Sequence, residues 1–249
     1  MHSGFALGAP PPLDALTQEH ELALFLDFDG TLVEIASTPG AIKPEPDLAD
    51  KLAALAIRLK GRCAIVSGRA ISDIESYVGP LPIAAAGSHG SDIRSADGQS
   101  LGKPAAPLPR SIETELRSFA EAQDLQFEKK PHGGALHFRN DPSKGPDAYV
   151  FAKALADAQG WAVQSGKCVV EIVARTASKG EAVRVLMEST PFAGATPVFI
   201  GDDLTDEAGF AACHELDGFG VLVGAREESA ARYGLRDVMQ VHKWLEALS

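Results

Sequence analysis

Short, wholly apolar runs alternate with segments of helical periodicity in the first third of the chain. Residues 22–26 and 63–66 are runs of this kind, and each breaks off abruptly into polar residues. Between them, leucines and alanines recur at helical spacing over residues 47–59. Strands buried on both faces of a parallel sheet are continuous apolar runs, and strand–helix alternation is typical of that fold class. The pattern therefore predicts a parallel α/β core.

This pattern continues to the end of the chain with one interruption. The further elements predicted for the core are a helix at 71–77, a strand at 83–86, a helix at 179–187, strands at 197–200 and 220–223, and a closing helix at 238–248. The last strand predicted for the sheet is therefore the one at 220–223.

The interruption begins after about residue 98 with a proline-rich stretch at 102–109, which is typical of a linker. It then predicts a helix at 111–122, strands at 125–130 and 135–139, a helix from 146 to a stop at Gly160, and strands at 161–164 and 167–173. We therefore expect an inserted α+β domain at 101–175. The core would consist of residues 1–100 and 176–249, with residues 1–20 as a loose tail.

Composition narrows the class of protein. The chain has 249 residues, 45% of them hydrophobic and 23% charged, which is ordinary for a globular protein with a substantial core. Its net charge of −11 argues against a general binder of nucleic acids or anionic membranes. Three scattered cysteines suit a reducing compartment, and no lysine or arginine precedes Lys43, so we expect no signal peptide. We predict a cytoplasmic, monomeric protein that acts on a small molecule, without a nucleic-acid or membrane partner.

Polar residues of complementary type follow the predicted strands or open a helix. Asp27 and Asp29 come first, then Ser67, then Lys179, and finally the pair Asp202 and Asp203. Open α/β sheets bind ligands just past the carboxyl ends of their strands. Clustered carboxylates call for a divalent cation with oxygen ligands, and we expect Mg²⁺, while serine and lysine suit a phosphoryl group. For the first aspartate pair alone, a solvated turn after a strand is an equally good interpretation.

The ordered set of motifs resembles the haloacid-dehalogenase-like phosphatases, and within them the trehalose-6-phosphate phosphatases. The pieces that carry the resemblance are Asp27-Phe28-Asp29-Gly30-Thr31-Leu32, Ser67-Gly68-Arg69, Gly87-Ser88-His89-Gly90, Glu128-Lys129-Lys130, His137-Phe138-Arg139, Val170-Glu171-Ile172, Ser178-Lys179-Gly180 and Gly201-Asp202-Asp203-Leu204-Thr205-Asp206-Glu207. The resemblance implies a Rossmann-like core with a parallel sheet and an inserted cap of the C2 type. It also implies Mg²⁺-dependent hydrolysis of trehalose 6-phosphate. Two alternatives stay open: a phosphatase for another sugar phosphate, such as sucrose or mannose phosphate, and a non-catalytic sugar-phosphate sensor.

The resemblance also implies roles for the core residues. Asp27 would attack phosphorus and form an aspartyl-phosphate, and Asp29 would act as general acid and base. Mg²⁺ would be held by Asp27, the backbone carbonyl of Asp29 and Asp202. Asp203 would be a direct or water-mediated ligand, or would orient Lys179, while Asp206 would lie outside the ligand set. The residues expected to contact the phosphoryl group or the substrate near it are Ser67, Lys179, Thr31 and Arg69. For Ser67 the simpler alternative is a helix cap.

In the inserted domain, strand alternation puts Glu128 and Lys130 on one face, and His137 and Arg139 on one face of the partner strand. The resemblance implies that Glu128, Lys130 and Glu171 contact the distal glucose. Arg139 and His89 would assist. The simpler alternatives are a solvated hairpin face and, for His89, a loop histidine held by the backbone.

Overall fold

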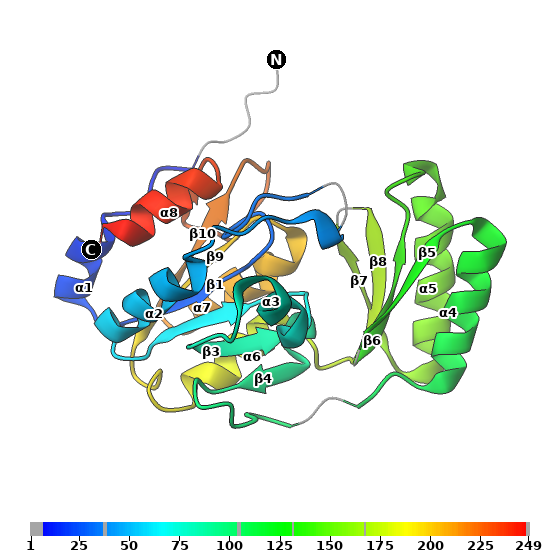
Figure 1. Cartoon of the computed structure of the whole chain (residues 1–249), viewed down its shortest axis with the longest axis horizontal. Helices are drawn as coiled ribbons and strands as arrows, with labels where there is room; N and C mark the ends of the chain where they lie inside the picture. Colours follow the sequence, from blue (N-terminus) through cyan, green and yellow to red (C-terminus); the bar gives the residue numbers. More distant parts are fainter. Residues whose placement is uncertain (1–6, 37–38, 104–105, 131, 167, 248–249) are drawn as a thin grey trace, which may run out of the picture. The chain divides into compact units, whose positions relative to one another are not determined.

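The computed structural model describes residues 7–36, 39–103, 106–130, 132–166 and 168–247. They form two compact units, one made of Met1–Gly102 with Ser178–Ser249 and the other of Lys103–Ala177. Each unit has its own sheet (Figure 1). The segment from 103 to 177 is thus an insertion between the two parts of the larger unit.

The larger unit is built on a seven-stranded sheet with the order β11-β10-β9-β1-β2-β3-β4. The strands are β1 (Leu22–Leu26), β2 (Cys63–Val66), β3 (Ala84–Gly87), β4 (Asp92–Arg94), β9 (Thr196–Gly201), β10 (Phe219–Val223) and β11 (Tyr233–Leu235). All neighbours pair in parallel except β3 and β4, which are antiparallel. The predicted parallel α/β core is confirmed, with an antiparallel strand added at one edge.

The apolar run of β1 is continuous because both faces of the strand are covered. Leu22, Leu24 and Leu26 belong to one buried cluster, whereas Ala23 and Phe25 belong to another. The first cluster includes residues of α2 (Leu48–Arg58) and α8 (Val238–Glu246), and the second includes residues of α6 (Lys179–Met187) and α7 (Glu207–Glu215). Successive side chains of a strand point to opposite faces, so this division follows from the sequence itself. Helix α3 (Ile71–Val78) also packs into the first cluster.

Three further features of the larger unit differ from the prediction. Helix α1 (Leu13–Glu19) lies where a loose tail was expected, because it buries Leu13 and Leu16. Strand β11 follows the strand predicted to be the last, and α7 follows the loop at 201–207 where no helix was predicted. With three residues β11 is too short for a clear alternating pattern, and α7 is concealed by the polar motif that precedes it.

The smaller unit has the predicted α-β-β-α-β-β order. Its elements are α4 (Arg110–Gln123), β5 (Gln126–Lys130), β6 (Gly133–His137), α5 (Gly145–Gln159), β7 (Ala162–Gly166) and β8 (Val169–Val173). They form an antiparallel sheet with the order β5-β6-β8-β7, covered on one face by α4 and α5 (Figure 1). Leu136, Val170 and Ile172 pack against that helix layer, where Phe119 and Phe151 stack with ring centroids 4.0 Å apart. The opposite face of the sheet carries polar side chains, as described below.

Candidate active site

The carboxyl end of β1 lies at the centre of the larger sheet, between β9 and β2. The amide of Asp27 donates a hydrogen bond to the Ile200 carbonyl at 2.9 Å, so the strand pairing with β9 continues into the loop that follows. Ligands of open α/β sheets bind beyond this edge. The fold therefore brings the polar ends of β1 and β9 together, as the sequence predicted.

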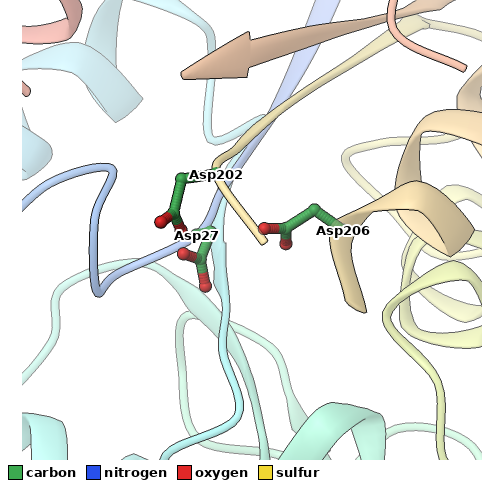
Figure 2. Close-up of side chains that lie close together, drawn as sticks. All are labelled: Asp27, Asp202 and Asp206. Atoms are coloured by element: carbon green, nitrogen blue, oxygen red, sulfur yellow. The ribbon is translucent and has the colours of Figure 1, made fainter. Parts of the chain in front are cut away.

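Three carboxylates meet there. Oxygen atoms of Asp27, Asp202 and Asp206 all lie within 4.8 Å of one another, and Figure 2 shows the three side chains close together. Asp27 and Asp206 are almost completely buried. Lys179 Nζ lies 2.7 Å from Asp27 Oδ1 and 2.5 Å from Asp206 Oδ1, and the Thr31 hydroxyl donates to Asp27 Oδ2 at 3.4 Å. One buried ammonium thus faces two buried carboxylates and leaves the group with an excess of negative charge.

Burial and this excess of negative charge shift the pKa values of Asp27 and Lys179. Burial raises the pKa of Asp27 well above its ordinary value, the charges of Asp206 and Asp202 raise it further, and Lys179 opposes them. Burial alone would lower the pKa of Lys179, but the charges of Asp206 and Asp27 outweigh it and raise that pKa. Lys179 is therefore held as a cation. A divalent cation beside the group would favour the carboxylate form of Asp27, and the all-oxygen donor set fits a hard ion.

Two glycines make the close approach of the carboxylates possible. Gly30 has a φ of +82°, and a Cβ placed on it would collide with the carboxylate of Asp202. A Cβ on Gly201 would collide with the side chain of Asp206. Glycine is the residue that allows both a positive φ and such a contact. The Gly-containing motifs at 27–32 and 201–207 are therefore needed for the geometry of the cluster.

The positions of Asp203 and Asp206 differ from the expectation. The Asp203 carboxylate accepts a hydrogen bond from the Leu204 amide at 2.8 Å and caps the short helix Leu204–Asp206. Asp206 Oδ2 accepts from the Asp203 amide at 2.8 Å and thereby completes a capping box. The structure brings Asp206, and not Asp203, beside Asp27 and Lys179. The capping-box spacing of three residues is the one sequence signal that could have indicated this.

Asp29 lies outside the carboxylate cluster and is paired with Arg69. Arg69 Nε and Nη2 donate to Asp29 Oδ2 and Oδ1 at 2.6 and 2.8 Å, and Nη1 donates to Asp73 at 2.7 Å. Such a two-point contact orients a carboxyl group strictly. The structure thus places Arg69, which was expected to contact substrate, in contact with the expected general acid.

Ser67 and His89 lie on neighbouring loops after β2 and β3. Ser67 is buried, and its Oγ accepts a hydrogen bond from the Arg69 amide at 3.1 Å. The amide of His89, also buried, donates to the Ser67 carbonyl at 3.0 Å. Ser67 does not cap the helix that follows, because the N-cap of α3 is Ala70 and has no side-chain hydrogen bond. The Ser67 hydroxyl and carbonyl instead hold backbone amides of the two neighbouring loops.

In the smaller unit, the polar face of the sheet carries a lysine–glutamate ion pair and a histidine–glutamate contact. Lys130 Nζ lies 2.5 Å from Glu171 Oε1, and His137 Nε2 lies 2.7 Å from Glu128 Oε2. Through Ala135 of the central strand β6, Glu128 and Glu171 stand in one row across three strands. Burial raises the pKa of Glu128, but the His137 contact and the Lys130 charge outweigh it and lower that pKa. These four side chains lie together as predicted.

Arg139 departs from the predicted strand. The second strand of the hairpin, β6, ends at His137, and Arg139 follows in a turn. Strand alternation therefore does not determine the face on which Arg139 lies. Pro131, between the two predicted strands of the hairpin, lies outside the described residues.

One supporting residue could not have been found from the sequence. Arg226 Nη2 donates to the backbone carbonyl of Asp202 at 2.9 Å, and its Nη1 lies 3.4 Å from Glu207. This contact joins the loop after β10 to the acidic motif. No motif or periodicity marks Arg226, since it lies in a loop without regular structure.

Among the described residues, the helices are too short or too polar for any of them to cross a membrane.

Comparison with known proteins gives a consistent result. A family model described as trehalose-phosphatase matches residues 25–239. A protein of Escherichia coli (strain K12) named trehalose-6-phosphate phosphatase is 36% identical over 246 residues, which cover 95% of this chain and 91% of that protein. This chain is therefore similar to a named phosphatase over nearly the whole length of both.

Solved structures confirm the fold. The C-terminal domain of C. albicans trehalose-6-phosphate phosphatase superposes with a TM-score of 0.83 at 24% identity, and the match covers 99% of each chain. A haloacid-dehalogenase-like hydrolase of B. subtilis superposes with a TM-score of 0.66 at 17% identity, covering 91% of this chain and 99% of that one. The match to the family model, which spans most of the chain and includes the carboxylate cluster, shows that the chain is a phosphatase of the trehalose-phosphatase family.

Proposed function

We propose that the protein hydrolyses trehalose 6-phosphate to trehalose and phosphate through an aspartyl-phosphate at Asp27. The observation that carries this proposal is the buried Asp27 carboxylate. It lies at the carboxyl edge of the sheet, in contact with Lys179 and beside the carboxylates of Asp202 and Asp206. The substrate is inferred from the E. coli relative, whose name gives trehalose 6-phosphate.

In this mechanism Asp27 and Asp29 divide the chemistry. An Asp27 oxygen attacks phosphorus as the bond to the sugar oxygen breaks, and Asp29 gives its proton to that oxygen. Asp29 then takes a proton from a water molecule that attacks the aspartyl-phosphate, which releases phosphate and restores the Asp27 carboxylate. The Arg69 contact orients Asp29 for both transfers. Ser67 and Lys179 bind the phosphoryl oxygens as neutral and charged donors.

We further propose that the site binds Mg²⁺ through Asp27, Asp202 and Asp206, together with the backbone carbonyl of Asp29. When bound, the ion would offset the negative charge that accumulates on the transferring phosphoryl group. The excess of carboxylates over ammonium groups in the cluster supports this assignment. Asp203 contributes through its helix cap, because its carboxylate holds the Leu204 amide.

The polar face of the inserted domain would bind the sugar. Recognition of several hydroxyl groups requires both hydrogen-bond donors and acceptors. This face offers both, because the carboxylates of Glu128 and Glu171 lie in one row across the sheet and the ammonium group of Lys130 lies in a nearby row.

The free cysteines Cys63 and Cys213 are buried, which suits the reducing interior of a cell. We therefore propose a cytoplasmic enzyme that acts on a small sugar phosphate.

Phosphate release from a panel of esters tests the substrate. We expect trehalose 6-phosphate to have a higher kcat/KM than sucrose 6-phosphate, mannose 6-phosphate and glucose 6-phosphate. Equal or faster hydrolysis of another sugar phosphate would assign the enzyme to that substrate instead. Tight binding of trehalose 6-phosphate without phosphate release would identify a sensor.

A further inference from the structure

The turn after β3, formed by Gly87–Gly90, has an unfavourable backbone conformation. Ser88, His89 and Gly90 all have positive φ values, of 48°, 57° and 89°. Residues other than glycine rarely adopt the left-handed region, and two in succession persist only where the surroundings hold them. Ser88 and His89 are both buried, so packing and backbone contacts on each side of the turn maintain this conformation.

On one side the turn is attached to the loop that carries Ser67. The Ser88 amide donates to the Arg69 carbonyl at 2.7 Å, and the His89 amide donates to the Ser67 carbonyl at 3.0 Å. The His89 ring lies directly against Gly68, where an added Cβ would be 2.6 Å from Cε1 and 2.8 Å from Nε2. The ring therefore occupies the space that a side chain at position 68 would need.

On the other side the same turn is packed against the start of α6. A Cβ on Gly90 would lie 2.6 Å from the Ser178 carbonyl oxygen and 3.2 Å from the Ala182 Cβ. Ser178 is the N-cap of α6, and its Oγ accepts from the Glu181 amide at 3.0 Å. Lys179 is the next residue. The turn thus touches the backbone directly before Lys179 and the backbone of Ser67.

We propose that the Gly87–Gly90 turn is a bracket that sets the position of Ser67 relative to Lys179, and that His89 is a positioning residue rather than a sugar contact. The proposal rests on the proposed function, in which Ser67 and Lys179 bind the same phosphoryl group. Misplacement of such groups by about 1 Å costs roughly 100-fold in rate. Glycine is then required at positions 68 and 90. A side chain at position 68 would displace the His89 ring, and one at position 90 would collide with the Ser178 carbonyl oxygen.

The first test compares Gly90→Ala with Gly79→Ala. Gly79 has a similar φ of +82°, but a Cβ there would meet nothing within 4 Å, so this variant introduces the backbone strain without the clash. We expect Gly90→Ala to lower kcat/KM for trehalose 6-phosphate about 100-fold and to weaken binding of inorganic phosphate, measured by calorimetry. Gly79→Ala should change both values less than twofold. Equal effects of the two substitutions on phosphate binding would overturn the bracket.

The second test is a double-mutant cycle between Gly68 and His89. Gly68→Ala should weaken phosphate binding because the new Cβ displaces the ring. His89→Ala should also weaken it in the wild-type background, yet strengthen it in the Gly68→Ala background by removing the clash. This reversal of sign is specific to a packed positioning role. A His89 that contacts only the sugar would leave phosphate binding unchanged in both backgrounds, and that result would reject the proposal.

The two proposals can fail separately. A wild-type protein that binds inorganic phosphate but does not hydrolyse trehalose 6-phosphate would contradict the proposed function, while the phosphate measurements on the variants still decide on the bracket. Normal hydrolysis by the wild type, with phosphate binding unaltered in Gly90→Ala and Gly68→Ala, would contradict the bracket alone. A wild-type protein that neither binds inorganic phosphate nor hydrolyses trehalose 6-phosphate would contradict both proposals.

Discussion

The two units of the protein differ in the balance between acidic and basic side chains at their polar clusters. In the larger unit, Lys179 faces Asp27 and Asp206 while Asp202 stands beside them, so carboxylates outnumber the ammonium group. In the smaller unit, Lys130 pairs with Glu171 and His137 contacts Glu128. A cluster with excess charge is costly unless an ion of opposite charge is bound, whereas paired groups need none. The first arrangement suits the binding of a cation and a phosphoryl group, and the second suits neutral hydroxyl groups.

Asp27→Asn should have the largest effect on the larger unit. Replacement of the attacking carboxylate by an amide is expected to lower kcat by about 10⁴-fold or more, as is usual for loss of a catalytic nucleophile. Burial and the charges of Asp206 and Asp202 disfavour the Asp27 carboxylate, so the variant should unfold at the same or a higher temperature. Phosphate release and thermal unfolding measure the two effects. Undiminished hydrolysis by a folded Asp27→Asn protein would rule out the nucleophile assignment.

The next prediction compares a substitution in the carboxylate cluster with a matched substitution at the helix cap beside it. Asp206→Asn removes a charge that contacts Lys179, whereas Asp203→Asn keeps a side-chain oxygen able to cap the short helix. We expect Asp206→Asn to raise the Mg²⁺ concentration for half-maximal activity about tenfold or more, in line with loss of one charged contact. Asp203→Asn should shift it less than threefold. The reverse order would favour Asp203 as a metal ligand, which is one of the roles that the family resemblance implied for it.

The smallest effects are expected in the smaller unit, where two lysine–glutamate pairs can be compared. Glu171→Gln alters the pair on the polar face, and Glu113→Gln alters the exposed pair with Lys129 at α4. Glu171→Gln should raise KM for trehalose 6-phosphate about tenfold, since hydrogen bonds to charged groups contribute about 1.5–3 kcal/mol. It should leave the hydrolysis of p-nitrophenyl phosphate unchanged, and Glu113→Gln should alter neither reaction. Equal KM values for the two variants would show that the polar face does not recognise the sugar.

The comparison also explains which parts of the fold and of the candidate site could be predicted from the sequence. Asp27, Lys179 and Asp202 could be brought together because each stands next to a strand or helix end, and parallel strands end at one edge of a sheet. The choice between Asp203 and Asp206 could not, since it depends on which carboxylate caps a single turn of helix. Likewise, the Arg69–Asp29 contact and the left-handed turn at Ser88 and His89 depend on side-chain and backbone conformations that no periodicity encodes. Helix α1 was missed because only two of its residues, Leu13 and Leu16, are buried.

The dependence of activity on a divalent cation tests the central claim most directly, because the claim is that the carboxylate excess around Asp27 is balanced by a bound ion. Phosphate release from trehalose 6-phosphate should be measured in excess EDTA and again after Mg²⁺ is added beyond the chelator. We predict that EDTA abolishes hydrolysis and that Mg²⁺ restores it. Turnover that persists unchanged in EDTA would contradict this account of the site.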